Sequence, residues 1–271
     1  MNIAFWSNVR HQSGVTSCVA LMSVLWTELF VEEITVTSNH ICTKGLVKRL
    51  CGGCEYEEKI AKKAYHYMLG EPEYFRMLYS GNMKKTVWLN ENLRYIPMEG
   101  EAGKLFAPVG LQDERKCVEE QEIRLIDTAC GYTLCSQKIV EDAEIKVILF
   151  PPDRDSIDAF FQSDTASWED YFFIVGNYRS EVSCRPVYLS KRYHVPLERI
   201  GVIPYNFGFE QAMQDGSTIA YIAQNMRCSR RSKEYWFFQC AKETVKNLRK
   251  YVIYRRDVQC GECGKVSNAD G

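Results

Sequence analysis

Residues 2–26 read NIAFWSNVRHQSGVTSCVALMSVLW. An apolar, β-rich run at 2–6 is followed by a polar loop at 7–17 and then by the apolar pattern of a buried helix. Continuous apolar runs of this kind are typical of strands that are covered on both faces. A strand, a loop and a helix in this order favour a sheet of parallel strands flanked by helices.

The same alternation recurs along the rest of the chain. Further strands are predicted at 34–38, 122–127, 145–150, 171–176 and 200–203. Helices are predicted at 16–30, 43–50, 55–68, 133–141, 153–162, 183–194, 207–224 and 230–250. A short hairpin is predicted where 86–89 and 93–96 flank Asn90-Glu91-Asn92. The predicted fold class is α/β, a doubly wound, mostly parallel sheet flanked by helices, with a small hairpin insertion.

The composition is that of an ordinary globular protein. Of 271 residues, 46% are hydrophobic and 25% are charged, which excludes a disordered chain or a fibre. Because 34 Lys and Arg balance 35 Asp and Glu, the chain is far less basic than a protein that coats nucleic acid. We find no export signal and no membrane-spanning run, so the 12 cysteines predict reduced thiols in a cytoplasmic protein. We expect one domain at 1–257 and a loosely ordered, Cys-containing tail at 258–271.

The loop at 7–17 has features of an anion site. Backbone N–H groups at the start of a helix can converge on an anion, and the helix dipole assists them. The usual phosphate loop has the pattern G-x-x-x-x-G-K-[ST]. Gly14 and Thr16 fit this pattern, but Val15 stands in place of the lysine and Val9 in place of the first glycine. The motif alone fits equally well a polar turn that caps a core helix.

A carboxylate at the end of another predicted strand adds to this pattern. Residues 125–131 read LIDTACG, which places Asp127 at the end of a buried strand and before a turn of small residues. A nucleotide site in an α/β protein needs a carboxylate there to hold the water shell of Mg²⁺. A lone aspartate at a strand end is more often a helix cap, so the pairing with the 7–17 loop carries the prediction.

Four segments together resemble the deviant Walker A P-loop ATPases typified by MinD, ParA and the TadZ/CpaE pilus-localisation proteins. In chain order they are FWSNVRHQSGVTS, IDTACGYTLCSQKIVEDAEIKVILF, FFIVGNYRS and IGVIPYNFGFEQAMQDG, and the resemblance spans about residues 1–250. It implies a MinD/ParA-like P-loop NTPase fold, ATP or ADP with Mg²⁺ as ligands, and a homodimer that sandwiches the nucleotide.

The resemblance also implies roles for single residues. The predicted cofactor-binding residues are Gln12, Ser13, Gly14, Val15, Thr16, Ser17, Asn177, Pro204 and Asn206. Thr16 and Asp127 would hold Mg²⁺ and its water. Arg10 aligns with the signature lysine of the family, and its guanidinium could reach phosphates across a dimer. Asn177 is not followed by the Lys and Asp with which GTP-specific relatives recognise guanine, and this favours adenine. The alternative is that Asn177 is only a turn residue after a strand.

Two departures from the family pattern predict weak or absent ATP hydrolysis. Val15 replaces the lysine of the phosphate loop, and 36–40 lacks the aspartate that follows the second strand in the family. Phosphoryl transfer relies on positioning and charge stabilisation, so each loss costs roughly a few kcal/mol of barrier. We therefore expect a degenerate, TadZ-like protein that serves as a dimerising switch or localisation scaffold for pilus, secretion or partition machinery. The alternative is an interaction scaffold that binds no nucleotide.

Two C-x2-C pairs, Cys51 with Cys54 and Cys260 with Cys263, could supply four thiolates to Zn²⁺. The pairs are far apart in the sequence, so they would have to meet through the fold or across a dimer. The alternatives are coincidence in a Cys-rich chain and a redox-active pair.

The segment 227–257 is rich in basic and aromatic residues, with ten Lys and Arg against Glu234, Glu243 and Asp257. Such a segment can contact an anionic membrane surface or DNA, as MinD-like and ParA-like proteins respectively do. The favoured alternative is that its apolar residues pack on the sheet while the basic residues form a solvated face. Membrane contact would add a peripheral location at the membrane or a cell pole.

Overall fold

The computed structural model describes residues 1–9, 13–39, 45–52, 87–95, 122–163, 170–179 and 185–266. The strands are β1 (Asn2–Trp6), β2 (Ile34–Ser38), β3 (Val87–Trp88), β4 (Leu93–Tyr95), β5 (Ile123–Asp127), β6 (Ile145–Phe150), β7 (Tyr171–Tyr178) and β8 (Ile200–Pro204). The helices are α1 (Val15–Phe30), α2 (Leu46–Cys51), α5 (Leu134–Asp142), α6 (Arg154–Ser163), α7 (Pro186–Tyr193), α8 (Phe207–Asp215), α9 (Thr218–Asn225) and α10 (Tyr235–Val266), with a 3-10 turn at Leu197–Arg199.

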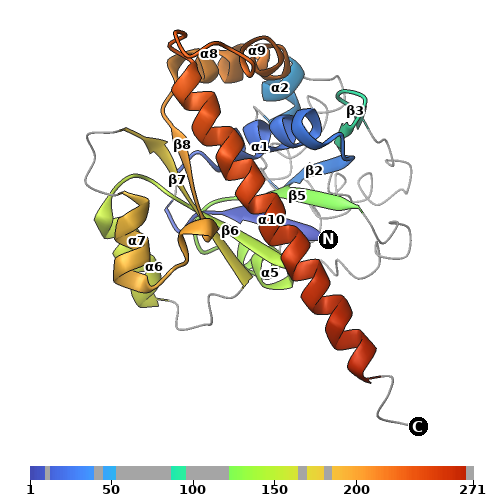
Figure 1. Ribbon diagram of the computed structural model, residues 1–271, viewed down its shortest axis with the longest axis vertical. Coiled ribbons are helices and arrows are strands. Elements are labelled where there is room, and N and C mark those ends of the chain that lie inside the picture. Colours follow the sequence, from blue (N-terminus) through green and yellow to red (C-terminus); the bar gives the residue numbers. More distant parts are fainter. Residues whose placement is uncertain are drawn as a thin grey trace, which may run out of the picture.

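The strands form one sheet in the order β3-β4-β2-β5-β1-β6-β7-β8 (Figure 1). All neighbouring pairs are parallel except β3 and β4, which are antiparallel and form the predicted hairpin. The predicted α/β class and the mostly parallel sheet are therefore confirmed. From β1 the chain runs to β2 and to the β3–β4 hairpin on one side and returns to β5, between β1 and β2. It then steps outward through β6, β7 and β8 on the other side, so the sheet is doubly wound.

Helices cover both faces of the sheet. On one face the largest apolar cluster joins the sheet to α1, α2, α8, α9 and α10. On the other face two smaller clusters join the sheet to α5, α6 and α7. The side chains of β1 alternate between these layers, since Ile3 and Phe5 pack with α1 while Ala4 and Trp6 pack on the opposite side. Burial on both faces explains why the strands read as continuous apolar runs.

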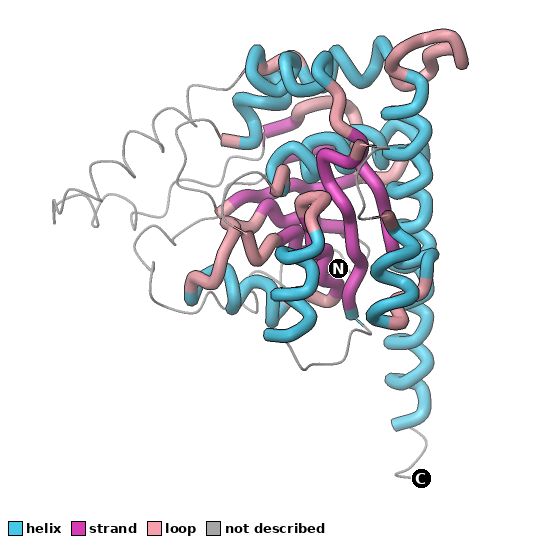
Figure 2. The backbone as a smooth tube through the Cα atoms, turned by 90° about the vertical axis from the view of Figure 1, so that its left-hand side faces the viewer, coloured by secondary structure: helices cyan, strands magenta, loops and turns pink. Residues whose placement is uncertain are grey.

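The longest helix, α10, packs along β8 and then extends past the sheet (Figures 1 and 2). The packing alternative for this segment predicted that Trp236, Phe237, Cys240, Val245 and Leu248 pack on the sheet. Phe237, Val245 and Leu248 are buried, but Trp236 is exposed at the start of the helix, where that prediction was wrong. The helix ends at Val266, beyond the predicted 250, so the expected loose tail is helical at its start. None of the helices in the described ranges is both long and apolar enough to cross a membrane.

One predicted helix is divided in the structure. The pattern at 207–224 forms α8 and α9, because Gly216 adopts a left-handed conformation with φ of 72° and ends α8. Gly216 also lies so close to the end of α2 that a Cβ there would stand 2.5 Å from the Cα of Gly52. The turn therefore needs glycine both for its backbone angle and for its close contact. The helix predicted at 55–68 lies outside the described residues.

Candidate functional site

The loop between β1 and α1 ends in a glycine that opens the helix. Gly14 is the N-cap of α1, with φ of 74°, and it has no side chain that could cap the first N–H groups. Ser13 packs directly against β7, because a Cβ on Gly176 would lie 3.2 Å from the Ser13 carbonyl oxygen. The start of α1 is thus held against the carboxyl end of the sheet, where parallel α/β proteins place their ligands. Arg10 and Gln12 lie outside the described residues.

Thr16 and Asp127 meet, as the sequence predicted. The Thr16 hydroxyl donates a hydrogen bond to Asp127 Oδ1 at 3.2 Å, and the Ser38 hydroxyl donates to Oδ2 at 3.2 Å. The Asp127 side chain has no exposed surface. In the paired strands Phe5 and Ser38 both lie opposite Asp127, so the three strand ends form one floor beneath the start of α1. The sequence did not single out Ser38, whose only signal was its place at the end of a predicted strand.

Two thiols lie close to this floor and remain protonated. Burial raises the pKa of the Cys18 thiol well above its ordinary value, and the nearby Asp127 carboxylate raises it further. Burial also raises the pKa of Cys130, although a hydrogen bond between its sulfur and the Ser13 hydroxyl, at 3.2 Å, opposes this shift. Neither thiol therefore adds negative charge at neutral pH, which suits a site for an anion.

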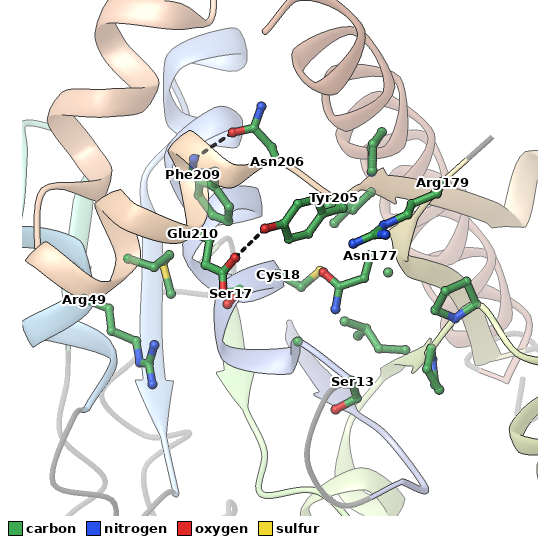
Figure 3. Close-up of a pocket in the computed structure, with 18 of the residues that line it drawn as sticks. Ser13, Ser17, Cys18, Arg49, Asn177, Arg179, Tyr205, Asn206, Phe209 and Glu210 are labelled. Carbon is green, nitrogen blue, oxygen red and sulfur yellow. Dashed lines mark hydrogen bonds between the residues drawn. The ribbon is translucent and has the colours of Figure 1, made fainter. Parts of the chain in front are cut away.

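A cavity of about 570 Å³ opens next to the start of α1 (Figure 3). Its lining includes six of the residues predicted to bind a cofactor: Ser13, Gly14, Ser17, Asn177, Pro204 and Asn206. Val15 is 2% exposed and packs in the core, so it contributes no polar group. Thr16 and Asp127 form the hydrogen-bonded pair beside the cavity rather than part of its lining. The predicted residues thus converge on one region, which is large enough for a small-molecule ligand.

Two charged residues in one wall of the cavity, Arg179 and Glu210, were not predicted. The Arg179 guanidinium lies over the Tyr205 ring at 4.9 Å, and the Tyr205 hydroxyl donates a hydrogen bond to Glu210 Oε2 at 2.8 Å (Figure 3). Asn177 lies beside this wall in a left-handed conformation with φ of 49°, which is uncommon outside glycine. Strained residues of this kind gather at functional sites, where the surrounding structure holds them in place.

Asn206, predicted as a base contact, is committed to contacts within the protein. Its Oδ1 accepts hydrogen bonds from the Phe209 backbone N–H at 2.7 Å and from the Tyr221 hydroxyl at 3.0 Å. Its Nδ2 donates to the Glu234 carboxylate. The residue is the N-cap of α8, so its amide positions that helix beside the cavity.

The structure gives no support to the zinc prediction. Of the four cysteines concerned, Cys51 alone has a described side chain, and it lies exposed at the end of α2. Cys54 and the side chains of Cys260 and Cys263 are outside the described residues. In the part of the chain that is described, no group of three or more His, Cys, Asp and Glu side chains could hold a metal ion.

Comparison with known proteins agrees with this architecture. No model of a protein family matches the chain, and no curated protein matches it in sequence. Among solved structures, MinD with Mg-ADP from Pyrococcus horikoshii has a TM-score of 0.63 at 16% identity and covers 94% of this chain and 99% of its own. A ParA family ATPase from Chlorobium tepidum has a TM-score of 0.59 at 11% identity, covering 91% and 98%. The MinC:MinD cell division complex from Aquifex aeolicus has a TM-score of 0.57 at 14% identity, covering 92% and 96%.

At these identities the likeness concerns the fold. The parallel sheet, the loop that opens α1 and the carboxylate at the end of β5 occur here in the order that the sequence resemblance implied. The chain therefore has the fold of the MinD and ParA ATPases.

Proposed function

We propose that the cavity binds an adenine nucleotide, ATP or ADP, together with Mg²⁺. The observation that carries this proposal is the 3.2 Å hydrogen bond between Thr16 and Asp127, beside a cavity that the uncapped start of α1 helps to line. Helix N-termini bind phosphate groups through their free N–H groups and their dipole. Asn177, at the other side of the same cavity, offers an amide to a base.

The residues beside the cavity fit Mg²⁺. The ion prefers oxygen ligands, and it keeps several waters while one or two carboxylates and the substrate phosphates complete its shell. Thr16 supplies a hydroxyl oxygen, and Asp127 supplies a fully buried carboxylate beside it. When bound, the ion would neutralise part of the phosphate charge. Ser38 keeps the second Asp127 oxygen oriented.

We propose that hydrolysis is weak or absent and that the chain works as a degenerate, TadZ-like switch or scaffold. Val15 is buried in the core, so position 15 supplies no cation to the phosphates. The family resemblance calls for an aspartate just after the second strand to position water, and residues 36–40, at the end of β2 and after it, carry no carboxylate. Nucleotide would still bias a homodimer through its differential affinity for the two states, and this could localise pilus, secretion or partition components in the cytoplasm.

Calorimetric titration of the purified full chain tests the binding proposal. ATP–Mg²⁺ and ADP–Mg²⁺ should bind and raise the melting temperature, whereas GTP–Mg²⁺ should bind more weakly. Phosphate release at saturating ATP should be slow. Absence of binding at millimolar ATP would support the alternative scaffold that uses no nucleotide, and rapid turnover would contradict the proposed loss of hydrolysis.

A second proposal concerns the basic segment 227–257. Its first basic residues, Arg227, Arg230, Arg231 and Lys233, are exposed in the turn between α9 and α10, and Trp236 is 46% exposed at the start of α10. Exposed basic side chains beside an exposed aromatic residue favour contact with an anionic membrane surface or with DNA. Sedimentation with anionic vesicles and mobility shift with duplex DNA, each at low and high salt, distinguish the two. Binding to neither would leave the segment with its packing role.

A further inference from the structure

Two arginines line the cavity although the loop lacks its lysine. Arg49 comes from α2 and Arg179 follows β7, and Figure 3 places them on opposite sides of the cavity with Ser13 and Ser17 between them. Glu210 is the one carboxylate among the described lining residues, and it accepts a hydrogen bond from the Tyr205 hydroxyl. The lining therefore carries a net positive charge.

The structure fixes the position of Arg49 through its backbone. The Thr218 hydroxyl donates a hydrogen bond to the Arg49 carbonyl oxygen at 2.7 Å. The turn at Gly216 packs against the same end of α2, because a Cβ on Gly216 would lie 2.5 Å from the Lys48 carbonyl oxygen. The end of α2 is thus held against α9, which directs the guanidinium of Arg49 to the cavity (Figure 3).

The charge of a nucleotide explains why this position matters. A di- or triphosphate carries several negative charges, and the N-terminus of a helix supplies the equivalent of about half a positive charge. Val15 is buried and apolar, so it adds no positive charge. Arg179 lies on the Tyr205 ring at the side of the cavity where Asn177 lies, away from Arg49. Among the lining residues that the structure describes, Arg49 is the cation on the remaining side.

We propose that Arg49 supplies, from within the same chain, the phosphate-binding cation that the loop lacks at position 15. This inference rests on the proposed binding of a nucleotide. A guanidinium pairs with two phosphate oxygens at once, in a planar geometry that an ammonium group does not reproduce. The site would consequently select nucleotides with at least two phosphates over the nucleoside, and the preference would weaken as salt screens the charge.

Calorimetric titration of ADP–Mg²⁺ and of adenosine tests the role of Arg49. Arg49→Gln should weaken ADP binding roughly 10- to 100-fold, the range expected for one hydrogen-bonded charge pair, and leave adenosine binding unchanged. Arg49→Lys should recover part of the loss. Lys48→Gln removes a positive charge from the same turn of α2 without altering the lining, and it should change ADP affinity less than about twofold.

Each result of this experiment has a definite meaning. Equal ADP affinity in the native protein and Arg49→Gln would overturn the role of Arg49 while leaving the nucleotide proposal intact. Equal losses for ADP and adenosine would show that Arg49 merely shapes the cavity, which also overturns it. Failure of the native protein to bind any nucleotide would instead overturn the proposed function. Melting temperatures without ligand identify any variant that fails to fold.

Discussion

The hydroxyl of Thr16 hydrogen-bonds Asp127 Oδ1 at 3.2 Å across 111 positions of sequence. The contact exists because β1 and β5 are parallel neighbours, with Phe5 opposite Asp127, so the strand that ends at Asp127 finishes beneath the loop that leads into α1. Parallel strands put all their carboxyl ends at one edge of the sheet, where loops converge on a ligand. The site is thus a consequence of strand order rather than of local sequence.

Replacement of Asp127 by asparagine should remove the dependence of nucleotide affinity on Mg²⁺. Asp127→Asn keeps the shape of the side chain but removes the buried negative charge that would face the ion. We expect ADP binding with Mg²⁺ to weaken about 10-fold, while binding with a chelator present stays unchanged. Titration calorimetry in both conditions measures this difference.

The control for that variant is Asp142→Asn. Asp142 forms an ion pair with Lys138 at 3.0 Å on α5, and neither residue lines the cavity. Its replacement should leave nucleotide affinity and its Mg²⁺ dependence as they are in the native protein. An equal response to Mg²⁺ in Asp127→Asn and in the native chain would refute the assignment of Asp127.

Two asparagines that line the cavity should respond to mutation in opposite ways. Asn206→Ala removes the N-cap of α8 and leaves Tyr221 and Glu234 without their shared partner, which should cost about 1–2 kcal/mol of unfolding free energy. Asn177→Gly retains the left-handed backbone, so it should cost less stability than Asn206→Ala.

Thermal unfolding and ADP titration together separate the two asparagines. Asn206→Ala should lower the melting temperature by about 3–6 °C. Asn177→Gly should lower it less than Asn206→Ala and weaken nucleotide binding several-fold, because it removes a polar contact to the base. A large loss of stability in Asn177→Gly, with normal nucleotide affinity, would show that Asn177 is only a turn residue.

Periodicity and composition were sufficient for most of the fold. Buried strands read as uninterrupted apolar runs, so β1, β2 and β6 were predicted with the bounds that the structure shows. The division at Gly216 was missed because a helical pattern continues through it, and only the contact with α2 shows why the chain must turn there.

The cavity was predicted less completely than the fold. Ser13, Gly14 and Asn177 were found because they follow strands, and strand ends are recognisable in a sequence. Arg49 and Arg179 were not found, because their roles depend on how α2 and the end of β7 are placed around the cavity. Charged residues on short helices, such as Arg49, and in turns after strands, such as Arg179, are usually solvated, so no local pattern distinguishes these two from other arginines.

Two of the left-handed glycines, Gly14 and Gly216, should differ in their tolerance of alanine. A Cβ on Gly14 would meet nothing closer than Asn177 Nδ2 at 4.0 Å, so Gly14→Ala should cost about 1 kcal/mol for the backbone angle alone. Gly216→Ala adds a collision with the backbone of α2 and should cost about 1–3 kcal/mol more. Urea unfolding of both variants measures the difference, and equal losses would contradict the packing of the turn at Gly216 on α2.

The link between α1 and α10 should make stability depend on pH. Glu32 accepts a hydrogen bond from Trp26 Nε1 at 2.7 Å and another from Arg249 Nε at 3.0 Å. Burial raises the pKa of Glu32, but the hydrogen bonds from Arg249 and Trp26 outweigh it, so the net pKa lies below the ordinary value of 4.5. A carboxyl group whose pKa is lower in the folded state than in the unfolded state stabilises the fold. The full contribution is present at pH values above the unfolded-state pKa, and it is lost as the pH falls through the folded-state pKa.

Glu32→Gln should therefore lower the free energy of unfolding at pH 7 by up to about 1 kcal/mol, since the pair is partly exposed to solvent. The difference from the native protein should shrink as the pH falls below the ordinary pKa of 4.5, because protonated Glu32 then resembles glutamine. Urea unfolding between pH 7 and about pH 3.5 follows this change. Glu28→Gln, on the exposed side of α1, is the control and should show no such trend. A difference for Glu32→Gln that is constant over the same pH range would mean that the ion pair with Arg249 contributes nothing to stability.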